Sequence, residues 1–146
     1  MISVNILKLS FTICLSIIYS LTSFAGRETN GNIIIESFDS IPSEIDGGCC
    51  VFYRYPSATQ NDGYIMVNDL ANTAYMVINH QLEEFTLVVN KKNTYWYKNS
   101  KYTLKVKIAR TQSKVHDENY DVKGNLIIED SNKNKKSLSF CGNCSW

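Results

Sequence analysis

The sequence predicts an all-β domain, a small antiparallel barrel or sandwich of about 7–8 strands linked by disulfides. Three observations support this prediction. Apolar segments with a strand-like pattern recur along the chain, turn-forming residues separate them at roughly even spacing, and no segment has the period of an amphipathic helix. Four of the five cysteines are grouped two and two near the ends of the domain, which favours disulfide bonds.

The individual strands follow from the distribution of apolar and polar residues. The alternation is clearest over residues 102–109, which we expect to form a strand with one buried face. The apolar segments 64–68 and 74–79 flank a short stretch of turn-forming residues, so we expect them to form a hairpin. The further expected strands are 32–38, 51–55, 85–89, 120–129 and 138–141.

The first 25 residues have the layout of a secretory signal peptide. Lys8 precedes an apolar run over residues 9–21, and Ser23 and Ala25 are the small residues of a cleavage site. A transmembrane anchor is the alternative, but the run is shorter than the ~20 residues of a membrane-spanning helix. A lipid anchor at Cys14 is less favoured, because small residues do not precede it. We therefore expect a protein exported to the periplasm or the exterior.

Cleavage after residue 25 would leave a flexible lead-in over residues 26–31 and a single all-β domain over residues 32–146. The whole chain has 15 Lys and Arg against 14 Asp and Glu, and without Lys8 the two signs balance. This balance argues against a nucleic-acid binder that relies on a basic field. No segment after the signal peptide is apolar enough to predict a membrane span.

Cys49, Cys50, Cys141 and Cys144 would remain after cleavage, an even number that favours disulfides in an exported chain. Adjacent cysteines rarely bond to each other, so we expect the two clusters to pair. Cys49 would bond to Cys141 or Cys144, and Cys50 to the remaining one. A single bridge with two free thiols is the alternative, and the sequence does not choose the connectivity.

Two other uses of these cysteines compete with structural disulfides. Cys141 and Cys144 have the CxxC spacing of thiol–disulfide oxidoreductases, but only two residues follow, too few for the helix that lowers a redox thiol's pKa. A zinc site of four cysteines is the second alternative, and adjacent Cys49 and Cys50 fit poorly around one tetrahedral ion. We therefore predict structural disulfides, no metal site and no cofactor.

Tyr95, Trp96 and Tyr97, together with Lys105 and Lys107, form the leading candidate for a binding surface. On a strand, Tyr95 and Tyr97 share one face and Trp96 takes the other. The alternative is that both faces are covered by the core or a loop, with the lysines as a solvated face or a guard against edge pairing.

The remaining polar residues predict no catalytic site. His80 and His116 are the only histidines, and neither has the spacing of a metal site or a catalytic triad. We expect both to be surface residues. The paired acids of the chain lie in loop-like segments, where carboxylates are usually solvated.

Several segments resemble those of small exported bacterial proteins of uncharacterised function. These segments are the export signal, Cys49–Cys50 before an aromatic strand, residues 74–79 and 124–128, and the CxxC at residues 141–144. More distantly, the chain is similar to the exported β-barrel inhibitors of C-type lysozyme, which also tie an early cysteine to a late one. That resemblance implies a periplasmic or surface protein that blocks a host hydrolase by inserting a loop. The Ser-Gly-x-x-Tyr loop of those inhibitors has no counterpart here, and residues 95–102 lie in roughly the corresponding region.

Taken together, these features predict an exported, non-enzymatic binding module that engages a protein partner, with an inhibitor role as one form of this function. A structural, envelope-associated domain without a specific ligand is the first alternative. A thiol–disulfide oxidoreductase that uses the CxxC at residues 141–144 is the second.

Overall fold

The computed structural model describes residues 31–56, 62–110 and 119–145. The expected signal peptide and residues 26–30 of the expected lead-in lie outside these ranges. The described residues from Asn32 onward belong to one compact unit. Its strands are β1 (Ile35–Glu36), β2 (Cys49–Arg54), β3 (Met66–Asn68), β4 (Thr73–Ile78), β5 (Gln81–Lys91), β6 (Thr94–Lys98), β7 (Tyr102–Arg110), β8 (Asn119–Asp130) and β9 (Lys135–Ser145).

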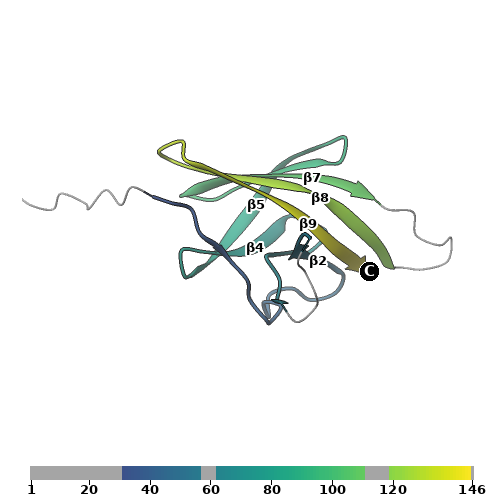
Figure 1. Cartoon of the computed structure of the whole chain (residues 1–146). Helices are drawn as coiled ribbons and strands as arrows, with labels where there is room; N and C mark the ends of the chain where they lie inside the picture. The colour runs from purple at the N-terminus through teal and green to yellow at the C-terminus, as the bar shows by residue number, and fades with distance from the viewer. Residues whose placement is uncertain (1–30, 57–61, 111–118, 146) are drawn as a thin grey trace, which may run out of the picture. The chain divides into compact units, whose positions relative to one another are not determined.

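The strands form a closed antiparallel barrel (Figure 1). Their order is β1-β4-β3-β2-β9-β8-β7-β6-β5, and the additional pairing of β4 with β5 closes eight of them into a ring, with β1 as an extra strand on β4. The all-β prediction is thus confirmed, and of its two forms the barrel is the one observed. The expected hairpin is β3–β4, and the expected strand over residues 102–109 is β7.

The core fills the inside of the barrel with the inward-facing residues of each strand. Phe52, Phe85 and Phe140 are fully buried, and the rings of Phe52 and Phe140 meet edge to face with centroids 4.8 Å apart. In β7, Leu104 and Val106 are buried, whereas the lysines that alternate with them are exposed. This alternation arises because successive side chains of a strand point to opposite faces.

Two glycines allow the strands and rings to approach each other closely. A Cβ on Gly124 would overlap the backbone oxygen of Lys107 and would lie 2.7 Å from the ring of Phe140. A Cβ on Gly142 would overlap the backbone oxygen of Val51. Carbon atoms do not approach this closely without displacing their neighbours, so both positions require glycine.

A polar network lies at the start of β5. Glu83 is buried, its Oε1 forms an ion pair with Nζ of Lys101, and its Oε2 accepts a hydrogen bond from Nδ2 of Asn99 at 3.0 Å. Nζ of Lys101 also donates to Oε1 of Gln81 at 3.0 Å. Asn90, near the other end of β5, lines a cavity instead. One end of the barrel therefore carries a charged network, whereas the other end contains a cavity.

In the described part of the chain, no helix has the length and apolar character needed to cross a bilayer.

Candidate functional site

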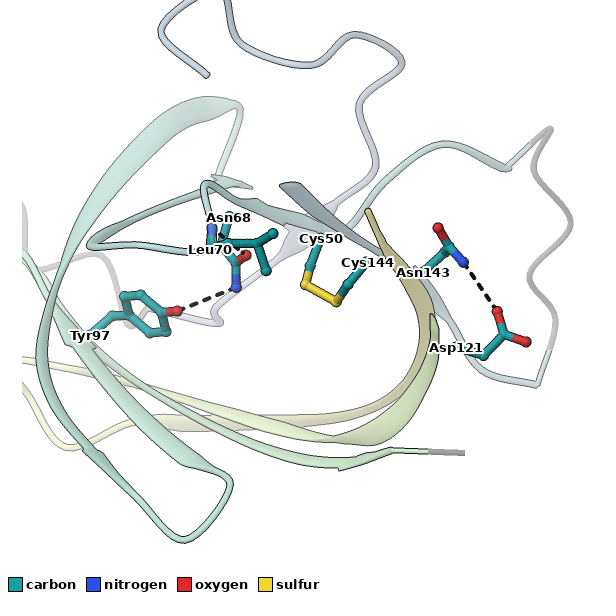
Figure 2. Close-up of a disulfide and its surroundings, with 7 residues drawn as sticks. All are labelled: Cys50, Asn68, Leu70, Tyr97, Asp121, Asn143 and Cys144. Atoms are coloured by element: carbon teal, nitrogen blue, oxygen red, sulfur yellow. Dashed lines mark hydrogen bonds between the residues drawn. A yellow bond between two sulfur atoms is a disulfide. The ribbon is translucent and has the colours of Figure 1, made fainter. Parts of the chain in front are cut away.

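One disulfide joins β2 to β9. Cys50 and Cys144 lie directly opposite each other in the antiparallel register, 94 residues apart in sequence, and both are buried. Figure 2 shows their sulfur atoms on the inner side of β9, whereas the side chain of neighbouring Asn143 lies on the outer side, where its Nδ2 donates to Oδ1 of Asp121 at 3.3 Å. The bridge thus forms part of the inner lining of the barrel.

The expected second bridge is absent, because Cys49 and Cys141 are free thiols. Cys49 lies opposite Ser145, and Cys141 lies opposite Tyr53. Four positions of strand therefore separate the two thiols, about 13 Å along the sheet, and disulfides require Cα atoms within about 7 Å. Adjacent cysteines of a strand point to opposite faces, so Cys49 cannot join Cys50 inside the barrel.

The CxxC spacing does not place two thiols side by side. Residues three apart on a strand face opposite sides, so Cys144 points inward to its bridge while Cys141 points outward. Burial raises the pKa of the other free thiol, Cys49, which lowers its thiolate fraction near neutral pH. The geometry therefore offers no pair of exchanging thiols in this motif.

In the described part of the chain, the histidines and acids do not form a cluster that could hold a metal ion, since no three His, Cys, Asp or Glu side chains converge on one point there. His80 is exposed, and its Nδ1 lies 2.8 Å from Oε1 of Glu36. His116 lies outside the described residues.

The predicted aromatic surface is divided between the two sides of the barrel wall. Trp96 points outward with Lys105 and Lys107, which face solvent on β7. Tyr97 is 3% exposed and points into the core, and half-buried Tyr95 lines the interior cavity. The expectation that Tyr95 and Tyr97 share one face is correct, but this face is the inner one. Tyr97 therefore does not belong to an exposed surface.

On the outer face, a β-bulge creates an exposed apolar patch beside Trp96. The register of β5 with β6 shifts between Leu87 and Val89, which leaves Val88 as an extra residue. As a result Val88 and Val89 are both exposed, at 62% and 47%, although they are consecutive. Val89 lies opposite Trp96. Two consecutive valines are the only trace of this bulge in the sequence, and they are equally compatible with a regular strand.

The patch borders a shallow hollow of about 340 Å³, the Trp96 hollow, whose charged residues are all basic. Nζ of Lys105 lies 5.5 Å from the centre of the Trp96 ring, the geometry of a cation–π contact. The described residues that line the hollow are Val88, Val89, Lys91, Trp96, Lys98 and Thr103, together with Tyr97, whose side chain points to the inner side of the wall.

Inside the wall, a second feature lies next to the disulfide. It is a cavity of about 130 Å³, the mouth cavity, and its lining includes the Cys50–Cys144 bridge, Asn68 and Tyr97. Nδ2 of Asn68 donates a hydrogen bond to the Tyr97 hydroxyl at 3.3 Å, as Figure 2 shows. Burial raises the pKa of Tyr97 to about 12. No motif in the sequence indicates this cavity, because its lining comes from strands far apart along the chain.

The turn between β3 and β4 forms one side of the mouth cavity. Leu70 has a φ of 58°, and its backbone N–H donates to Oδ1 of Asn68 at 3.2 Å. Oδ1 of Asp69 accepts hydrogen bonds from the backbone N–H groups of Ala71 and Thr73, both at 2.9 Å. Partial burial tends to raise the pKa of Asp69, but these hydrogen bonds outweigh burial and lower it. The turn therefore holds Leu70 in a left-handed conformation that leucine rarely adopts.

Comparison with protein-family models, with curated proteins and with solved structures finds no match for this chain.

Proposed function

We propose that this chain is an exported, non-enzymatic binding module that holds an acidic segment of a protein partner at the Trp96 hollow. The observation that carries the proposal is the combination at one place of exposed apolar side chains, an aromatic ring and basic residues. Val88 and Val89 are exposed, Trp96 lies beside them, and the charged residues of the hollow are lysines.

The apolar part of the hollow supplies an anchor for a partner. Tryptophan is among the residues that contribute most to protein–protein binding, and it does so where surrounding apolar groups exclude water. Val88 and Val89 provide such groups, because the bulge turns both toward solvent. The two adjacent valines leave apolar surface in water, and a partner that covers this surface gains the free energy of its burial.

The charges of the hollow favour an acidic partner. Three lysines lie around the apolar patch: Lys91, Lys98 and Lys105. Lys107, two residues after Lys105 on β7, faces the same outer side. The chain as a whole is close to neutral, so the attraction is confined to this face. A partner segment with carboxylates on either side of an apolar side chain would complement both the lysines and the apolar patch of the hollow.

Site-specific photo-crosslinking tests this proposal. A photoreactive phenylalanine analogue at Val89 should yield a discrete adduct with a protein in cells that produce the chain. The same analogue at Leu82, which is 56% exposed on the same strand, is the matched control and should not yield this adduct. Lys98→Glu and Lys105→Glu should reduce the adduct strongly, whereas Lys136→Glu, an exposed lysine on β9, should not.

The outcomes separate the proposal from its alternatives. No adduct at Val89, or equal adducts at Val89 and Leu82, would contradict binding at the Trp96 hollow and favour a structural domain. An adduct with nucleic acid instead of protein would contradict it as well. A purified C-type lysozyme serves as one defined partner, because of the resemblance to its inhibitors. If the chain inhibits lysozyme, and Lys98→Glu and Lys105→Glu leave this inhibition unchanged, binding occurs through another part of the barrel.

A further inference from the structure

The mouth cavity is not used by the proposed protein-binding face, because the two lie on opposite sides of the barrel wall. We propose that this cavity binds a small uncharged molecule, about the size of one aromatic ring, that carries a hydroxyl or amide group. The proposal is independent of the function assigned to the Trp96 hollow.

The volume of the cavity defines the size of the ligand. An eight-stranded barrel has an interior that is just wide enough for its own side chains or for one small ligand. Here the middle of the barrel is filled by phenylalanine rings, while about 130 Å³ stay open beside the disulfide. An apolar cavity of about 150 Å³ is known to accept benzene, so a single ring is the appropriate scale.

The chemistry of the lining defines the polarity of the ligand. The described residues of the lining include no Lys, Arg, His, Asp or Glu. An ionised ligand would therefore lose its hydration without gaining an opposite charge, which is unfavourable. The lining does hold amide and hydroxyl groups, from Asn68, Asn90, Tyr95 and Tyr97, which can donate and accept hydrogen bonds. An uncharged molecule with one polar group matches both properties.

The cavity has an open rim and a floor that the disulfide holds in place. Ala71, Asn90 and Asn93 are exposed at its rim, whereas Val122 and the Cys50–Cys144 bridge are buried. The disulfide holds β2 and β9 together at this point, so the floor is preformed. Preformed sites bind small ligands with a smaller loss of conformational entropy.

Titration of the ¹⁵N-labelled protein with phenol, followed by NMR, tests the proposal. Phenol should bind saturably, and about tenfold more tightly than benzoate or benzylammonium, which have a similar size but carry a charge. Ile108→Phe adds a ring to the cavity lining and should weaken phenol binding by about tenfold or more. Ile127→Phe is the matched control, because Ile127 lies on the outer face of β8, and it should leave binding unchanged.

A second measurement does not depend on whether the Ile108→Phe protein folds. In the wild-type protein, NOEs from the phenol ring should reach methyl groups of Leu87, Ile108 and Val122 inside the wall. NOEs to Val88 and Val89 instead would place phenol in the Trp96 hollow and overturn the proposal. Absence of saturable binding, or equal binding of phenol and benzoate, would overturn it too. None of these results bears on the photo-crosslinking at Val89.

Discussion

Trp96 and Tyr97 are neighbours in β6 but face opposite sides of the barrel wall. The Trp96 ring lies on the outer face under the Lys105 ammonium group, whereas Tyr97 is buried and its hydroxyl accepts a hydrogen bond from Asn68. Two adjacent aromatic residues therefore have different roles. One lies on the outer face beside lysines, and the other belongs to the core and lines the mouth cavity.

The first prediction compares the two residues directly. Trp96→Ala should lower the free energy of unfolding by less than about 1 kcal/mol, because the ring lies on the outer face. Tyr97→Ala should lower it by about 3–5 kcal/mol, because it leaves a cavity in a packed core. Urea denaturation followed by circular dichroism measures both. A large destabilisation by Trp96→Ala would show that the indole is structural and would weaken the case for the Trp96 hollow.

The second prediction concerns alkaline pH. Burial raises the pKa of Tyr97 from 10.0 to about 12 in the folded protein. Below pH 10 both the folded and the unfolded chain keep this proton, so the contribution of Tyr97 to stability is fully present and does not change with pH. Between about pH 10 and about pH 12 the unfolded chain releases the proton first, so stability falls as pH rises, by about 2–3 kcal/mol in all.

Tyr97→Phe isolates this contribution from that of the other tyrosines. Burial also raises the pKa of Tyr53 and of Tyr75, and both remain in the variant. The difference in stability between the two proteins should therefore shrink or reverse from pH 9 to pH 11, because only the wild type loses the contribution of Tyr97. Absorbance of tyrosinate gives a second readout, in which the variant lacks a late ionisation step near pH 12. Equal pH dependence of the two proteins would contradict the burial of this hydroxyl.

The third prediction concerns the close approach at Gly124. Gly124→Ala should destabilise the barrel by about 2–4 kcal/mol, because its Cβ would collide with the backbone oxygen of Lys107. Phe140→Leu in the same chain should not restore stability, since the collision with the backbone remains. Lys123→Ala, at the adjacent exposed position, should change the free energy of unfolding by less than about 1 kcal/mol. Chemical denaturation tests all three, and a Gly124→Ala variant as stable as the wild type would refute the close contact.

The fourth prediction concerns the cysteines. Replacing Cys50 and Cys144 together by alanine should lower the free energy of unfolding by about 4 kcal/mol, because their bridge joins residues 94 positions apart in sequence. Replacing Cys49 or Cys141 by serine should cost less than about 1 kcal/mol, since neither forms a bridge. Urea denaturation measures these differences.

Alkylation of the native protein checks the same assignment without substitutions. Peptide mapping should find label on Cys49 and Cys141 and none on Cys50 and Cys144. Because burial raises the pKa of Cys49, its labelling should be slow near neutral pH and accelerate in alkaline solution. Label on Cys50 or Cys144 in the native protein, or fragmentation of the linked peptide that places Cys49 in the bridge, would contradict the arrangement.

The sequence predicts the fold well because a half-buried strand leaves a direct trace in it. The alternation over residues 102–109 becomes β7, and the two apolar segments on either side of residues 69–72 become β3 and β4. It predicts the disulfide only in part. Cys49 and Cys50 cannot both face inward, but the choice of Cys50 depends on the register of β2 against β9.

The candidate sites depend more strongly on the tertiary structure. Period-two alternation places Tyr95 and Tyr97 on one face and Trp96 on the other, but it does not say which face is the inner one. That choice is made when β5 to β7 join a closed barrel and their inner faces are covered by the opposite wall. The bulge at Val88 likewise arises from the pairing of β5 with β6, where the register shifts by one residue. It cannot be predicted from the sequence of either strand alone.

The sequence alone identifies an all-β domain with antiparallel strands, clustered cysteines and an aromatic segment among lysines. These are local properties, and the alternation and composition of single segments express them. Three features become visible only in the folded domain: that it is a barrel, that Cys50 bonds to Cys144, and that the Trp96 hollow and the mouth cavity lie on opposite sides of one wall. Register, closure and cavities arise from contacts between residues far apart in the chain, and no single segment encodes them.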